Sequence, residues 1–185
     1  MDKMQWKVLK PATEIWANDW IKIVEMHVRL PTGVEAQFYA MDALDGVGVL
    51  AVDDQRCAIL MRQYRPALEK DILELPAGQV EGGEDRRETA CRELAEEAGL
   101  RARDLYYLGS FYRNPARDTG SMHVYFARVA GSTSPRQERY EYLETVRLPL
   151  DDLFTQVLNH EIWDAATVFA VLMLQSRLER GDIQL

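Results

Sequence analysis

Cysteine, histidine and long apolar runs are all scarce in this 185-residue chain. The two cysteines, Cys57 and Cys91, have neither metal-ligand nor redox spacing, so a disulfide scaffold is not expected and a reducing compartment is indicated. We expect both to be small core residues. The three histidines have no second metal ligand at a suitable spacing, and we assign them no chemistry.

Leader and membrane-spanning segments are also not expected. Residues 1–11 contain no apolar h-region, and the longest apolar stretch, 165–174, is too short to cross a bilayer. Basic residues number 22 against 30 acidic ones, and this net charge of −8 disfavours contact with nucleic acid or acidic lipid. We expect a cytoplasmic protein with no nucleic-acid or membrane partner, and a small anionic ligand remains open where a metal ion neutralises it.

The sequence does contain a continuous pattern of strands and helices. Alternating residues at 20–30 and 35–40, with a turn at 31–33, predict a hairpin. Further strands are predicted at 46–52, 57–62, 106–112, 122–129 and 142–147. Helices are predicted at 85–98, ending at Gly99, and at 165–180. This order favours an α/β fold with a mixed sheet sandwiched between helices.

Acidic residues cluster on one side of the first predicted helix. At about 100° per residue, three fall together: Glu93, Glu96 and Glu97. Arg92 can pair with Glu88 and Glu96 at a spacing of four, but it cannot neutralise the whole cluster. A magnesium ion can, because it prefers carboxylate and phosphate oxygens. Taken alone, the cluster is better explained as a solvated helix face.

The residues around the cluster change this interpretation. Gly78 is followed after five residues by Glu84, and after seven more by the run 92–100, RELAEEAGL. This spacing resembles the Nudix box at every specified position. A chance match in a chain of this size is expected on the order of once in ten million. We therefore interpret the chain as similar to the Nudix hydrolase superfamily.

The resemblance implies a set of metal ligands. Glu93 and Glu97 would be the main ligands of Mg²⁺, with Mn²⁺ as a possible substitute, and Glu96 would be an additional one. Gly78 would let the backbone turn tightly, so that the carbonyl of Ala77 can also reach the metal.

The resemblance also implies a reaction. Glu84 would orient the loop and Arg92 would hold the carboxylates, although a purely structural salt bridge is an equally good interpretation of both. Water would attack phosphorus in line, in a nucleoside diphosphate linked to another group. The metal would polarise the phosphoryl oxygens while a carboxylate takes the proton.

Flanking segments resemble the ADP-ribose pyrophosphatase branch of the family over roughly residues 44–178. Pro115, sixteen residues beyond Gly99, matches the marker proline of that branch, and we group it with the substrate-binding residues. By the same likeness, Arg65 would touch the diphosphate and Glu74 would lie beside the substrate or its metals. The catalytic base would come from the loop after 131, where Glu141 matches best and Glu138 is the rival; exposed charges without a role are as good an interpretation of either.

The segment after Pro115 departs from that branch, because 116–120 reads ARDTG where glycine and then an acid are usual. GDP-mannose or another nucleotide sugar therefore stays open as the substrate, and Arg113, Arg117 and Asp118 could read a different sugar or base. A non-catalytic, nucleotide-sensing Nudix domain is the alternative from another class. The complete carboxylate set argues against it. Isomerisation would need an added Cys or Glu pair that we do not find.

The domain organisation follows from the same likeness. Residues 1–43 are expected to form an antiparallel strand extension similar to the sheet through which ADP-ribose pyrophosphatases pair, which predicts a homodimer. Residues 44–185 would form the Nudix hydrolase domain. For Trp16 and Trp20, a core or interface role is favoured over a platform for base stacking.

Overall fold

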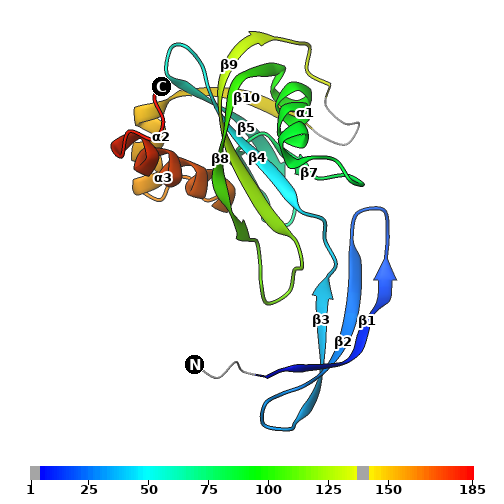
Figure 1. The fold of residues 1–185 in the computed structure, drawn as a ribbon. Coiled ribbons are helices and arrows are strands. Elements are labelled where there is room, and N and C mark those ends of the chain that lie inside the picture. The colour runs from blue at the N-terminus through cyan, green and yellow to red at the C-terminus, as the bar shows by residue number, and fades with distance from the viewer. Residues whose placement is uncertain (1–4, 137–141) are drawn as a thin grey trace. The chain divides into compact units, whose positions relative to one another are not determined.

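The computed structural model describes residues 5–136 and 142–185 (Figure 1). They divide into two compact units, Met1–Leu44 with Tyr112–Ser121, and Asp45–Phe111 with Met122–Leu185. The predicted bases Glu138 and Glu141 lie outside the described residues.

The smaller unit is a three-stranded antiparallel sheet. Its strands run in the order β1 (Lys7–Ala17), β2 (Lys22–Arg29) and β3 (Glu35–Met41). The predicted hairpin is confirmed, and its turn contains Gly33 with a φ of 88°. The distant segment Tyr112–Ser121 joins this unit through main-chain hydrogen bonds, from Met41 N to Arg117 O at 2.7 Å and from Thr119 N to Met41 O at 3.1 Å.

The larger unit contains a seven-stranded mixed sheet. Its strands are β4 (Gly46–Val52), β5 (Cys57–Arg65), β6 (Lys70–Glu74), β7 (Ala77–Gln79), β8 (Leu100–Tyr112), β9 (Ser121–Ser132) and β10 (Leu143–Pro149). The main order is β10-β5-β4-β9-β8, with β6 paired to β5 and β7 paired to β4. Strand β4 is parallel to β9 and antiparallel to β5, which makes the sheet mixed as predicted.

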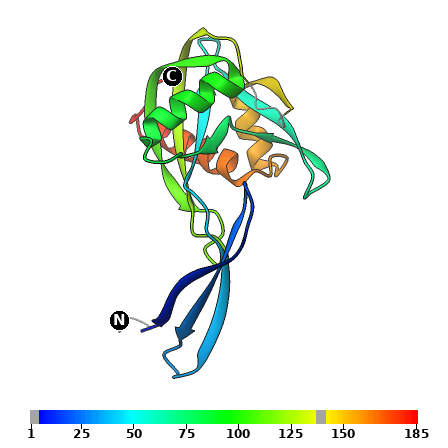
Figure 2. The same cartoon turned by 90° about the vertical axis from the view of Figure 1, so that its right-hand side faces the viewer.

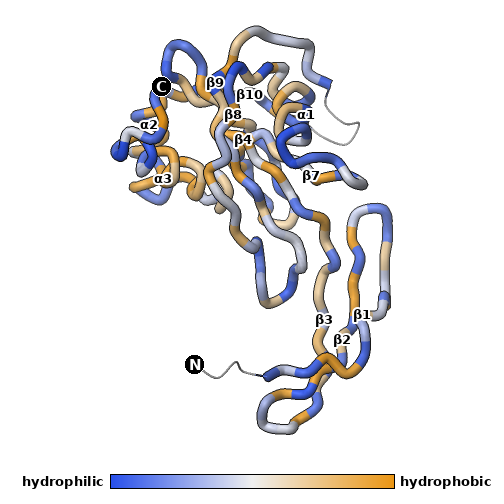
Figure 3. The backbone as a smooth tube through the Cα atoms, viewed as in Figure 1, coloured by the Kyte–Doolittle hydropathy of each residue, from blue (hydrophilic) through white to orange (hydrophobic). Residues whose placement is uncertain are grey.

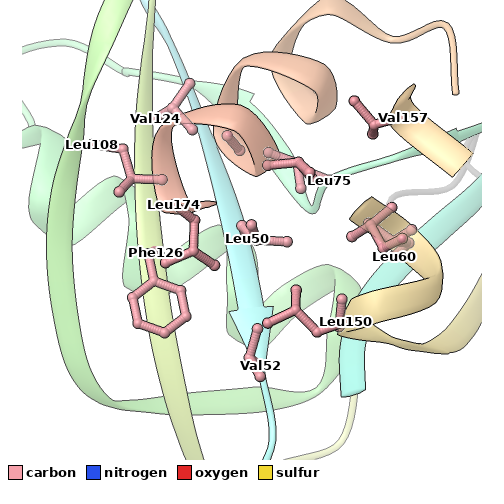
Figure 4. Close-up of a cluster of buried hydrophobic side chains, with 14 of the residues drawn as sticks. Leu50, Val52, Leu60, Leu75, Leu108, Val124, Phe126, Leu150, Val157 and Leu174 are labelled. Carbon is pink, nitrogen blue, oxygen red and sulfur yellow. The ribbon is translucent and has the colours of Figure 1, made fainter. Parts of the chain in front are cut away.

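Helices cover both faces of this sheet. Helix α1 (Arg86–Ala98) lies on one face, and α2 (Leu150–Leu158) and α3 (Ala165–Glu179) lie on the other (Figures 1 and 2). Every residue of β4 is buried, because Val49 packs toward α1 while Leu50 packs toward α2 and α3. Figure 4 shows Leu50 among the buried side chains on the side of the sheet that α2 and α3 cover. The predicted α/β sandwich is confirmed.

Several local expectations were incomplete or wrong. Strands β1, β6 and β7 and helix α2 were not predicted, and β8 begins at Leu100 rather than at 106. Cys91 is exposed and Cys57 is only partly buried, so neither is the core residue that we expected. In the described part of the chain, no helix has the length and apolarity to span a bilayer.

Candidate active site

The loop and helix that carry the acidic cluster have defined ends. Asp85 caps α1 by accepting hydrogen bonds from the amides of Arg87 at 2.8 Å and Glu88 at 3.4 Å. Gly99 ends it in the left-handed region, with a φ of 64°. The segment between β7 and α1 is mostly hydrophilic (Figure 3); apart from Val80, which packs against the core, it is held by polar contacts.

Arg92 supplies most of those contacts. Its Nε and Nη2 donate to the two carboxylate oxygens of Glu84, both at 3.0 Å, and Nη2 also donates to the carbonyl of Gln79 at 3.2 Å. Its Nη1 donates to Glu93 at 2.8 Å and to Glu96 at 3.0 Å. One planar guanidinium therefore fixes both ends of the loop and two carboxylates of the helix.

This arrangement differs from the pairing expected from helical spacing. Glu84, eight residues before Arg92, takes the bidentate contact, and within the described part of the chain Arg92 makes no hydrogen bond or ion pair with Glu88. The hydrogen bond from Arg92 holds the pKa of the Glu84 carboxyl below its usual value, assisted by a bond from the Thr89 hydroxyl. The hydrogen bond to Glu84, with further bonds to the helix carboxylates, raises the pKa of Arg92, so the guanidinium stays charged.

Glu93 and Glu97 are buried, although they belong to the acidic side of the helix. Glu93 and Glu97 are each 8% exposed as whole residues, whereas the side chain of Glu96 is 44% exposed. Glu93 packs directly on Gly78, where an added Cβ would stand 2.6 Å from Oε2 and closer still to Oε1. Gly78 lies in β7 without a left-handed φ, so the tight turn that we expected is wrong. The glycine is needed for close approach.

Glu97 is held against the main chain of β7. Its Oε2 accepts a hydrogen bond from the amide of Ala77 at 2.9 Å. A buried carboxylate is costly unless it is hydrogen-bonded or paired with a cation. The bond to Ala77 therefore fixes Glu97 beside the residue whose carbonyl was expected to reach the metal.

Arg65 and Glu74 form a second charged group next to this face. Arg65 Nε donates to the two oxygens of Glu74 at 2.8 and 3.1 Å, and Nη2 also contacts Glu74. The bond to Glu74 raises the pKa of Arg65, with smaller contributions from the charges of Asp164 and Glu97. Arg65 therefore lies within the electrostatic reach of the acidic helix, while nearly half of its side chain stays exposed.

Asp45 anchors the loop between β7 and α1, and the sequence did not identify it as a site residue. Its carbonyl accepts from the amide of Val80 at 2.9 Å, and its carboxylate accepts from Arg86 at 2.8 Å. The buried ring of His123 bridges Asp45 at 3.3 Å and the hydroxyl of Tyr107 at 3.1 Å. No spacing in the sequence connects Asp45 with 80, 86 and 123, so no signal could have found this group.

The donor set of the acidic face fits a magnesium ion. Glu93 and Glu97 offer hard oxygen ligands from adjacent turns of α1, in a part of the surface that is largely shielded from water. Among the described residues, no three Asp, Glu, His or Cys side chains converge closely enough to hold a metal by themselves. Magnesium commonly takes one or two carboxylates and completes its shell with water and substrate phosphates. The face therefore suits an ion that binds together with a phosphate ligand.

The predicted site residues fall into three groups. The larger unit brings seven of them onto the adjoining segments just described: Arg65, Glu74, Ala77, Arg92, Glu93, Glu96 and Glu97. Pro115 belongs to the smaller unit and is not among the residues that the larger unit assembles. The roles of Glu138 and Glu141 stay predictions.

Residues 43–171 match the model of the NUDIX domain, which covers more than half of the chain. The chain belongs to the Nudix family. It is 33% identical over 164 residues to the ADP-ribose pyrophosphatase of Bacillus subtilis, with 88% of this chain and 89% of that protein covered. It is also 32% identical over 164 residues to the methanol dehydrogenase activator of Bacillus methanolicus, again with 88% of this chain and 89% of that protein covered.

The fold is shared with a solved structure as well. An ADP compounds hydrolase superposes with a TM-score of 0.84 at 23% identity, covering 98% of each chain. At that identity the likeness concerns the Nudix fold alone. The family match and the Bacillus subtilis relative place the chain among Nudix pyrophosphohydrolases of the ADP-ribose pyrophosphatase-like branch.

Proposed function

We propose that this Nudix enzyme uses Mg²⁺ to hydrolyse the pyrophosphate bond of ADP-ribose or a related nucleoside diphosphate sugar. The products would be a nucleoside monophosphate and a sugar phosphate. The observation that carries the proposal is the pair of buried carboxylates, Glu93 and Glu97, on adjacent turns of α1, with Glu97 within electrostatic reach of the half-exposed guanidinium of Arg65. A diphosphate needs cations on both sides, and this face offers a place for a metal next to a fixed guanidinium.

Each residue has a defined task in this proposal. Glu93 and Glu97 would hold the metal, with Glu96 and the Ala77 carbonyl as further oxygen ligands. The metal would supply charge neutralisation on the phosphoryl oxygens and a more acidic water. Arg65 would bind the diphosphate in an orientation fixed by Glu74. Arg92 would hold Glu93 and Glu96 in position while it keeps the loop closed.

The proton of the attacking water would pass to a glutamate on the loop after β9, for which Glu141 is our choice and Glu138 the rival. The first part of this loop is bonded to α1, since Arg136 N donates to the carbonyl of Glu96 at 2.7 Å. A cleft of about 370 Å³ lies there, lined by Arg92, Ala95, Glu96, Thr133, Ser134 and Arg136. This link supports a base delivered next to the metal-binding face.

ADP-ribose is the first substrate to test, because the Bacillus subtilis relative carries that name and covers most of this chain. GDP-mannose or another nucleotide sugar is the second candidate. The case for this second candidate rested on residues such as Arg113 and Asp118 reading a different sugar or base, and contacts within the smaller unit weaken it. The side chain of Asp118 is buried, and its carboxylate pairs with Arg113 Nε at 3.1 Å. A pair that satisfies itself has less capacity to read a sugar.

The test is a panel of substrates incubated with the protein and MgCl₂, followed by measurement of the released monophosphate. The panel contains ADP-ribose, GDP-mannose, UDP-glucose, NADH and diadenosine polyphosphates. We expect ADP-ribose or another diphosphate sugar to give the highest kcat/KM. Tight binding of one compound without turnover of any would instead support the nucleotide-sensing domain.

We also propose that the chain forms a homodimer through the smaller unit. Its strands leave large apolar side chains exposed: Val8, Ile15, Trp16, Phe38 and Tyr39. An apolar surface of this kind is typical of an interface. A monomeric mass in light scattering at micromolar concentration would refute the dimer. A cytoplasmic location stays a prediction from the cysteine content.

A further inference from the structure

A lysine and a tryptophan outside the predicted site lie next to Arg65. In the β5–β6 pair, Lys70 is the direct partner of Arg65, and Glu74 is the partner of Met61. Paired residues, and residues four apart along a strand, point to the same face of a sheet. Lys70, Arg65 and Glu74 therefore share one face, as the contact between Arg65 and Glu74 requires.

The indole of Trp163 is held beside this face. The Lys70 ammonium lies 4.2 Å from the centroid of the ring. The indole N–H donates to the carbonyl of His160 at 2.8 Å, and His160 has a left-handed φ of 59°. Trp163 is nevertheless 63% exposed, directly before Asp164, whose charge reaches Arg65. A rigid aromatic surface is thus presented to solvent beside the expected diphosphate site.

The two cations of this face differ in how their charge is compensated. Arg65 is paired with Glu74. Across residues 5–136 and 142–185, Lys70 forms no ion pair and no side-chain hydrogen bond, and its ammonium lies over the indole of Trp163. A cation resting on an exposed aromatic ring is weakly held and can leave it for a stronger partner such as phosphate.

We propose that Lys70 and Trp163 form a subsite for a phosphorylated ring, adjacent to Arg65. On binding, the ammonium leaves the indole and contacts the phosphate, and the ring of the ligand takes its place on the indole. This inference rests on the proposed function and extends it, because it assigns one half of the substrate to a place between β6 and the residues just before α3. A nucleoside monophosphate and a sugar phosphate both offer a ring that carries a phosphate.

The test compares variants of the complete chain in MgCl₂, using the best substrate of the panel and its two products as inhibitors. Trp163→Ala and Lys70→Ala are each expected to raise KM about tenfold, with kcat changed by less than about twofold. Trp163→Phe should keep most of the affinity because it keeps a stacking ring. Leu172→Ala, on the exposed side of α3, is the matched control and should leave KM unchanged.

Product inhibition identifies which half of the substrate is bound. A higher inhibition constant for the nucleoside monophosphate in both Ala variants would place that half on the indole. The same change for the sugar phosphate would place the sugar half there, and either outcome supports the subsite. Unchanged KM and unchanged inhibition by both products, with normal thermal melting, would overturn it.

Failure of the proposed function would be distinct from failure of the subsite. If the wild-type chain hydrolyses no substrate, binding of the two product types is measured directly by calorimetry in the same variants. Product binding that weakens in Trp163→Ala and not in Leu172→Ala would keep the subsite while the reaction is rejected. Binding that is equal in all variants, or absent from the wild-type chain, would reject the subsite too.

Discussion

The carboxylate of Glu93 occupies the space in which a side chain on Gly78 would stand. This contact joins β7 to α1 at the start of the acidic face of the helix, where we propose that the metal binds. Position 78 therefore requires glycine because the Glu93 carboxylate approaches its backbone closely, and not because its φ is left-handed. Glu93 can hold this position only while residue 78 has no side chain.

Gly78→Ala should therefore displace Glu93. We expect kcat to fall on the order of 100-fold, because a shift of about 1 Å in a catalytic group has an effect of that size. Gly82→Ala is the control, since a Cβ there would meet no atom within 4 Å and Gly82 has no left-handed φ. Steady-state kinetics of both variants is the measurement. Equal activity of the two would show that Glu93 needs no fixed position.

Arg92→Lys should separate charge from geometry. Lysine keeps the positive charge but cannot make the five hydrogen bonds that Arg92 makes to Glu84, Glu93, Glu96 and Gln79. We expect kcat or apparent Mg²⁺ affinity to fall about 10- to 100-fold, as for other groups that orient metal ligands. If Arg92→Lys retained wild-type values for both, the hydrogen-bond geometry would be unimportant.

The sequence predicted the core of this site because its chemistry is local. Glu93, Glu96 and Glu97 lie within two turns of one helix, and helical periodicity alone places them together. The burial of Glu93 and Glu97 was not predictable in the same way. It depends on β7, a three-residue strand that lies against α1 and is too short to give a periodic signal.

Contacts between distant residues account for the rest of what the sequence did not reveal. The bidentate bond from Arg92 to Glu84 depends on the path of the intervening loop, and Asp45 reaches that loop only through the pairing of β4 with β7. Strand β1 was not predicted because Pro11 lies within it and its residues do not alternate regularly. Register shifts also interrupt its pairing with β2.

Acid should lower the free energy of unfolding through protonation of Glu84. Its pKa is lower in the folded state than in the unfolded chain, because Arg92 bonds to the charged form. The resulting stabilisation is complete above the unfolded value of about 4.3 and is lost as pH falls through the lower folded pKa. Urea denaturation between pH 3 and pH 6 measures it.

Glu84→Gln should flatten this part of the pH dependence. Glu88→Gln provides the comparison, because Glu88 is exposed in the first turn of the same helix. We expect the Glu88 variant to keep the wild-type slope of unfolding midpoint against pH. The same slope in the Glu84 variant would mean that its bond with Arg92 adds nothing in solution.

The two candidate bases can be ranked by substitution. Glu141→Gln should lower kcat more than Glu138→Gln, because Glu141 is the better match to the base of the ADP-ribose pyrophosphatase branch. The pH dependence of kcat should lose its acidic limb in the variant that lacks the base. The reverse order of kcat values would assign the base to Glu138.

The proposed reaction depends on Glu93 and Glu97 holding a divalent ion against a bound diphosphate. Paramagnetic resonance of Mn²⁺, titrated in the presence of a non-hydrolysable diphosphate sugar, measures this binding directly. We predict uptake by the wild-type chain and by Glu88→Gln, and its loss in Glu97→Gln together with a fall in kcat on the order of a thousandfold. No uptake by the wild-type chain, or equal uptake by all three proteins, would contradict the account.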